Sequence, residues 1–166
     1  MKGNVDSSPA SVLETNRTSR EVFDDFAADA DAAVQASAAP EAWTTEDGTP
    51  WAVHRDRPLM AGPCPSVEYS DGPWQLKQLL LSPATDDPQG DRDRMRRHFE
   101  SRGMTVISVF DPQPNEPSYA EWTVMAQGKD GSWIEFSANS NGQGLLVYSE
   151  CSSHPSMQEE VSPTSP

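Results

Sequence analysis

The sequence has few cations, only two cysteines and no long apolar run, and these shortages exclude several classes of function. Lys and Arg account for 12 of the 166 residues, against 26 Asp and Glu, and the net charge is −14. Sequence-independent binding to nucleic acid needs cations that displace phosphate counterions, so we exclude it. A membrane-spanning helix needs about 18 or more consecutive apolar residues, and no segment offers them. The acidity favours a cationic partner instead.

The ends of the chain are poor in large apolar residues. We therefore expect residues 1–17 to form a disordered arm and residues 152–166 a disordered tail, with a single domain over residues 18–151. The opening residues contain no apolar h-region of a secretory signal. We expect either a cytoplasmic protein or the mature part of an exported one whose leader has been removed.

Catalytic motifs are missing as well. The sequence contains no nucleophile elbow, phosphate-binding loop, zinc-protease motif or dinucleotide-binding fingerprint. His54 with Asp56 and His98 with Glu100 have the composition of acid–base pairs, but helix neighbours two residues apart do not face each other, which weakens the second pair. We expect all four to be surface residues. We predict a protein that is not an enzyme and needs no cofactor or catalytic metal, with an enzyme of unrecognised site as a minor alternative.

Residues 119–151 show three alternating apolar runs separated by two turn signals. A three-residue loop over 129–131, with Gly131 in the left-handed conformation, and a two-residue turn at Asn141-Gly142 give one uniformly apolar face. The second turn is expected to pair Phe136 with Val147. The predicted inner face consists of Trp122, Val124, Ala126, Ile134, Phe136, Ala138, Leu145, Val147 and Cys151.

Upstream, capping signals and helical periodicity predict helices over residues 19–37 and 87–103. The acidic side of the first helix lacks the central Gly and terminal Glu of a calcium loop, so we expect it to be solvated. Further strands are expected at residues 67–70, 74–81 and 104–110. The predicted fold is α+β, an antiparallel sheet of about five to six strands with two helices packed on one face.

Three interpretations are open for Cys64 and Cys151. Structural zinc needs four N or S ligands, and no CxxC or HxxxH spacing is present. A thiol nucleophile needs a histidine base, and His54, His98 and His154 lie in no recognisable motif. A disulfide needs only proximity, and each cysteine ends an extended segment, so we favour it. Such a bond persists only in an oxidising compartment, which favours export.

The outer face of residues 119–151 is a candidate partner surface. Its members are Met125, Trp133, Glu135, Leu146 and Tyr148. The predicted turn sets Tyr148 opposite Glu135 and Trp133 opposite Glu150. A contiguous patch with two aromatic rings requires an explanation. Either the N-terminal arm or the loop that carries Trp43 and Trp51 covers it, or it binds a partner.

Several short motifs occur in a suggestive order: VFDDFAADADAAV in the first helix, then GPCP, RRHFESRGMTV, DGSWIEF and LLVYSEC. This order resembles small cell-envelope lipoproteins of actinobacteria, in which one cysteine follows the first helix and its pair closes the last strand. The resemblance implies a secreted, membrane-anchored precursor at the outer face of the cytoplasmic membrane, although this chain carries no lipobox cysteine. It implies no activity, because the family is largely of unknown function.

We therefore expect a monomeric, non-enzymatic envelope domain that binds an unidentified partner or ligand. The alternative is an acidic inhibitor or immunity-type protein that neutralises a basic partner by charge complementarity.

Overall fold

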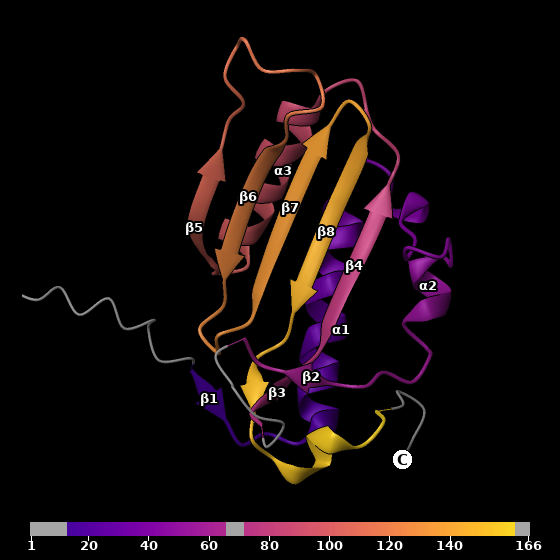
Figure 1. The fold of residues 1–166 in the computed structure, drawn as a ribbon, viewed down its shortest axis with the longest axis vertical. Coiled ribbons are helices and arrows are strands. Elements are labelled where there is room, and N and C mark those ends of the chain that lie inside the picture. Colours follow the sequence, from indigo (N-terminus) through magenta and orange to yellow (C-terminus); the bar gives the residue numbers. More distant parts are fainter. Residues whose placement is uncertain (1–12, 66–71, 162–166) are drawn as a thin grey trace, which may run out of the picture.

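The computed structural model describes residues 13–65 and 72–161 and shows an α+β fold built around one large antiparallel sheet (Figure 1). Within these residues the sheet has five strands in the order β4-β8-β7-β6-β5. The strands are β4 (Lys77–Ser82), β5 (Thr105–Phe110), β6 (Trp122–Gln127), β7 (Trp133–Asn139) and β8 (Gly142–Tyr148). The predicted fold class is confirmed.

A smaller sheet lies at one end of the large one (Figure 1). Its strands, in the order β1-β9-β3-β2, are β1 (Glu14–Thr15), β9 (Cys151–Ser152), β3 (Trp74–Gln75) and β2 (Gly62–Pro63). The strand predicted over residues 74–81 is therefore divided between two sheets, because the chain passes from β3 to β4 at the buried Leu76. The strand predicted at residues 67–70 lies outside the described residues.

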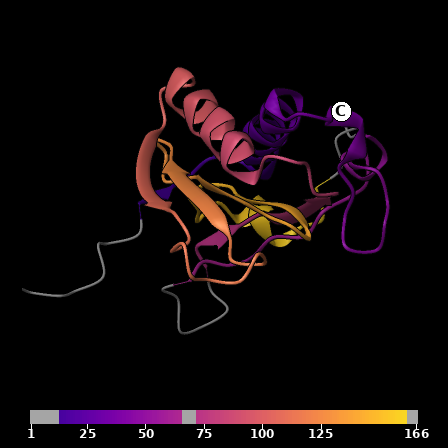
Figure 2. The ribbon, with the colours of Figure 1, turned by 90° about the horizontal axis from the view of Figure 1, so that it is seen from above.

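Two long helices, α1 (Ser19–Ala36) and α3 (Pro88–Ser101), cover one face of the large sheet (Figure 2). Both begin at side-chain caps, as predicted. The Thr18 side chain accepts a hydrogen bond from the backbone N–H of Glu21, and the Asp87 side chain accepts one from Gly90. Three short helical turns complete the described chain: η1 (Pro40–Ala42), α2 (Trp51–His54) and η2 (Pro155–Gln158).

The core lies between these helices and the inner face of the sheet. Apart from the half-buried Trp122, the predicted inner-face residues are buried. From the helix side, the core receives Val22, Phe23, Phe26, Ala30, Val34, Met95 and Phe99. Trp43 and Trp51 belong to the same core. The loop that carries these two tryptophans therefore fills the core and does not cover the opposite face.

The loop between β6 and β7 follows the prediction. Val124 pairs with Phe136 and Ala126 with Ile134, and Gly131 has a φ of 89°. This left-handed conformation is readily adopted only by glycine, so Gly131 closes the three-residue loop.

The turn between β7 and β8 lies one residue earlier than predicted, so the cross-strand register differs by two residues. Phe136 pairs with Leu145 rather than Val147, and the turn centres on Ser140-Asn141. The reason is a side-chain bond, because Asn139 Oδ1 accepts hydrogen bonds from the backbone N–H groups of Asn141 and Gly142 at 2.8 and 3.1 Å. A shift of two residues preserves the face of every side chain, so the core remains as predicted.

Both ends of the described chain pack on the domain, which corrects the predicted boundaries. At the N-terminal end, β1 pairs with β9 in parallel. At the C-terminal end, Met157 is fully buried and Val161 forms a bridge with Leu59. The predicted disordered arm and tail are therefore wrong for residues 13–17 and 152–161. Residues 1–12 and 162–166 lie outside the described residues.

Candidate functional site

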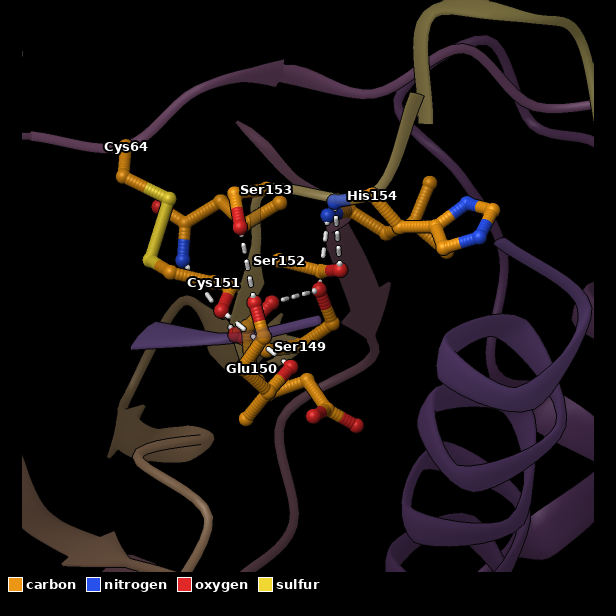
Figure 3. The surroundings of a disulfide bond; sticks show 10 residues. Cys64, Ser149, Glu150, Cys151, Ser152, Ser153 and His154 are labelled. Carbon is orange, nitrogen blue, oxygen red and sulfur yellow. Dashed lines mark hydrogen bonds between the residues drawn. A yellow bond between two sulfur atoms is a disulfide. The ribbon is translucent and has the colours of Figure 1, made fainter. Parts of the chain in front are cut away.

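Cys64 and Cys151 form a disulfide, as predicted, with their Cα atoms 6.2 Å apart (Figure 3). Both residues are buried. Cys151 opens β9, and the backbone N–H of Cys64 donates to the carbonyl of Pro73, just before β3. Because both sulfurs are used in the disulfide, the thiol-nucleophile and metal-ligand interpretations of the cysteines do not apply.

Serine hydroxyls beside the disulfide tie the chain ends together (Figure 3). Ser152 Oγ donates to the carbonyl of Arg17 at 2.6 Å, and Ser153 Oγ donates to that of Thr15 at 3.2 Å. His154 caps η2, because its Nδ1 accepts from the backbone N–H of Ser156. The serines and the histidine in this cluster are therefore engaged in backbone contacts that hold the fold.

Two of the four residues considered as acid–base couples contact other side chains instead. His54 Nε2 lies 2.8 Å from Gln78 Oε1, and Glu100 pairs with Arg96 at 3.2 Å. His98 Nε2 is buried and has no hydrogen-bond partner in the described chain. Burial, together with the nearby Arg102 charge, lowers the pKa of His98. All four were expected to be surface residues, and this expectation is wrong for His98, whose ring is half-buried.

The predicted partner surface lies on the sheet face opposite the helices, where outward side chains form three cross-strand rows. The first row consists of Lys77, Tyr148, Trp133 and Gln127. The second row consists of Leu79, Leu146, Glu135 and Met125. The third row consists of Leu81, Gly144, Ser137 and Thr123. The structure therefore brings all five predicted residues together in the first two rows, which we call the open face.

Trp133 lies opposite Tyr148 in this arrangement, not opposite Glu150 as predicted. The two rings stack with centroids 3.8 Å apart and planes inclined by 17°. The ammonium group of Lys77 lies 5.5 Å from the centroid of the Tyr148 ring. This first row is a continuous stack of a cation and two aromatic rings, held by three neighbouring strands.

Glu135 is the acidic residue at the centre of the open face. It lies opposite Leu146 on one side and Met125 on the other, whereas the predicted register paired it with Tyr148. All three side chains are half-buried. A carboxylate with apolar neighbours on both sides presents a charge within a hydrophobic surface.

A hollow of about 350 Å³ lies at one end of the open face, beside Lys77 and Tyr148 and under Met60 and Pro63. A second hollow of about 340 Å³ lies beyond the second row and is lined by Leu79 of that row and by Leu81 and Gly144 of the third. The sequence analysis missed Leu79 and Leu81, although alternation within residues 77–82 carries them onto this face. It also missed the exposed Ile107, Val109 and Phe110 of β5, at one edge of the sheet.

Two further sites lie beside the helices. A cavity of about 690 Å³ borders α1 and α2, where Asp31 accepts from Trp51 Nε1 at 2.8 Å and pairs with Arg55 at 2.5 Å. Elsewhere, carboxylate oxygens of Asp25, Asp130 and Glu150 lie within 4.8 Å of one another, which is compact enough to hold a metal ion.

No protein-family model matches this chain, and neither a curated protein nor a solved structure shows significant similarity to it. The resemblance to actinobacterial envelope lipoproteins therefore stays a prediction. Within residues 13–65 and 72–161, none of the helices has the length and apolar character that crossing a bilayer requires.

Proposed function

We propose that this protein is an exported, non-enzymatic domain of the cell envelope that binds a basic partner protein through the open face of its large sheet. The observation that carries the proposal is the Trp133–Tyr148 stack beside Glu135 on a face opposite both long helices. Aromatic side chains surrounded by polar groups dominate the energy of protein interfaces.

The disulfide supports export. A bond between Cys64 and Cys151 that is part of the folded core persists in an oxidising compartment and is rare in reducing ones. The proposed location is the outer face of the cytoplasmic membrane. The family resemblance implies a lipid anchor, which a longer precursor would carry.

Charge supports a basic partner. A net charge of −14 steers cationic proteins towards this one and repels acidic ones. On the open face, Glu135 offers a carboxylate between Leu146 and Met125, which suits an Arg or Lys flanked by apolar side chains. Stacking against Trp133 fixes Tyr148 before binding, which reduces the entropy lost when a partner docks.

The same surface also suits an inhibitor or immunity-type protein, which is the second candidate. The acidity that favours a basic partner would serve equally to block a basic enzyme or toxin. The two candidates differ in consequence, because only an inhibitor suppresses the activity of the partner that it captures.

The test compares Glu135→Lys with Glu46→Lys, an exposed position in the loop before α2. Both variants change the net charge by the same amount, so a difference between them reports the open face alone. Each protein, immobilised with its disulfide intact, is incubated with an envelope extract, and bound proteins are quantified by mass spectrometry. We expect a basic protein that the wild type and Glu46→Lys retain and Glu135→Lys loses. Identical profiles from all three proteins would contradict the proposal.

A further inference from the structure

Three acidic residues from distant parts of the sequence converge beside the N-terminal end of α1. Asp25 lies in α1, Asp130 in the loop between β6 and β7, and Glu150 in the link between β8 and β9. One carboxylate oxygen from each lies within 4.8 Å of the other two. The β6–β7 loop is held in place because Asp130 Oδ1 accepts from the backbone N–H and the hydroxyl of Ser132.

Glu150 is the unusual member of this cluster, because its side chain is only 1% exposed. Its Oε1 accepts a hydrogen bond from Arg17 Nη1 at 2.6 Å, whereas its Oε2 is buried without any partner. Figure 3 shows this side chain directed away from the disulfide. A buried carboxylate oxygen without a hydrogen bond is costly, and such an atom points to an ion or another donor.

The charges at the cluster do not balance. Within the cluster, Arg17 contacts Asp25 at 2.5 Å and Glu150 at 2.6 Å but not Asp130, and it also pairs with Glu21 outside the cluster at 3.3 Å. Lys129 borders the adjoining hollow, but it forms no ion pair in the described chain. An excess of negative charge therefore remains next to a buried oxygen.

Asp29 is a further carboxylate that lines the adjoining hollow. Asp29 pairs with Arg102 at 2.8 Å, a contact that by itself lowers a carboxyl pKa. Burial nevertheless raises the pKa of Asp29, and the charges of Asp130 and Asp25 add to the rise.

We propose that Asp25, Asp130 and Glu150 bind one divalent cation of the calcium class, in competition with the guanidinium of Arg17. Calcium prefers carboxylate oxygens, tolerates irregular geometry and completes its coordination with water. The adjoining hollow, of about 430 Å³, gives water access to Asp25 and Asp130. A bound cation would join α1, the β6–β7 loop and the β8–β9 link.

The test is a calorimetric titration of the full, oxidised chain with calcium chloride. We expect one site per chain, with a dissociation constant of about 10⁻⁴ to 10⁻³ M, as in extracellular calcium modules. Glu150→Gln and Asp130→Asn should each weaken binding about tenfold or more, because each removes a charge and keeps an oxygen that accepts the existing hydrogen bonds. Arg17→Gln should tighten binding, because it removes the competing cation. Glu116→Gln, at an exposed position away from the cluster, is the matched control and should bind as the wild type does.

Near-ultraviolet circular dichroism establishes that each variant is folded before titration. If Glu150→Gln fails to fold, Asp130→Asn carries the test, because its loop contacts to Ser132 remain possible. Three results would overturn the proposal. The first is the absence of saturable binding up to about 10 mM calcium, a concentration well above the range of weak extracellular sites. The second is a calcium affinity that neither Glu150→Gln nor Asp130→Asn changes. The third is binding of calcium by Arg17→Gln but not by the wild type. The last result would mean that Arg17 is the permanent cation of the cluster.

Discussion

Trp133 and Tyr148 face each other across β7 and β8, with their ring centroids 3.8 Å apart. Because one ring supports the other, neither can adopt another rotamer without losing the stack. Lys77 on β4 extends the row beyond Tyr148. The aromatic pair is therefore held in place before any partner arrives, by contacts that belong to the sheet itself.

Replacing Trp133 by Ala should cost little stability. The side chain is only half-buried, so the loss should stay below that of a core aromatic residue, with the stack contributing about 0.5 to 1.5 kcal/mol beyond the buried area. Phe136, three residues along the same strand, points into the core and is 1% exposed, so Phe136→Ala should cost about 3 to 5 kcal/mol. Urea unfolding of both variants measures the difference. If both variants lost the same free energy of unfolding, Trp133 would be a core residue and the open face would not be a binding surface.

Reduction of the Cys64–Cys151 bond should destabilise the fold strongly. The two residues are 87 apart in sequence, and a loop of that length stabilises by about 4 to 5 kcal/mol on the loop-entropy model. Protein oxidised during export should show no free thiol after unfolding without reductant, and its melting temperature should drop when reductant is added. Two titratable thiols in such material would refute both the bond and the argument for export.

Stability should fall as the pH decreases below about 6.5, the ordinary pKa of histidine. Burial lowers the pKa of His98 in the folded state, so between that lowered pKa and 6.5 the unfolded chain binds more protons than the folded one. The contribution of His98 to the free energy of unfolding is thus complete above pH 6.5, and it is lost as the pH falls through the pKa of His98 in the folded state. Replacing His98 by Gln should flatten this part of the stability profile, measured by urea unfolding at several pH values. His54→Gln, the matched control, should leave the His98 contribution intact, and an unchanged slope in the His98 variant would exclude His98 as its source.

Period-two alternation was sufficient to predict the two faces of the sheet, but not all of its pairings. The β7–β8 register depends on Asn139, whose side chain closes the turn one residue earlier than Asn141-Gly142 suggested and so shifts each cross-strand partner by two residues. Since a two-residue shift keeps every side chain on its face, the inner face was predicted correctly, whereas the partners of Trp133 and Glu135 on β8 were not.

Contacts between distant segments could not be predicted from local patterns. Met157 and Val161 are isolated apolar residues in a polar stretch, and their burial depends on packing such as the bridge between Val161 and Leu59. The cluster of Asp25, Asp130 and Glu150 likewise has no sequence spacing that identifies it. Its members meet only because the fold brings α1, a hairpin loop and the β8–β9 link together.

Site-specific photocrosslinking is the most direct test of the central claim that the open face binds a basic envelope protein. Leu146, at the centre of the open face, is replaced by a photoreactive phenylalanine in cells that produce the protein naturally. Arg96, an exposed residue of α3 on the other side of the molecule, receives the same substitution as the control. We predict a discrete adduct with a basic envelope protein from position 146 and none from position 96. No adduct from position 146, or the same adducts from both positions, would contradict the account.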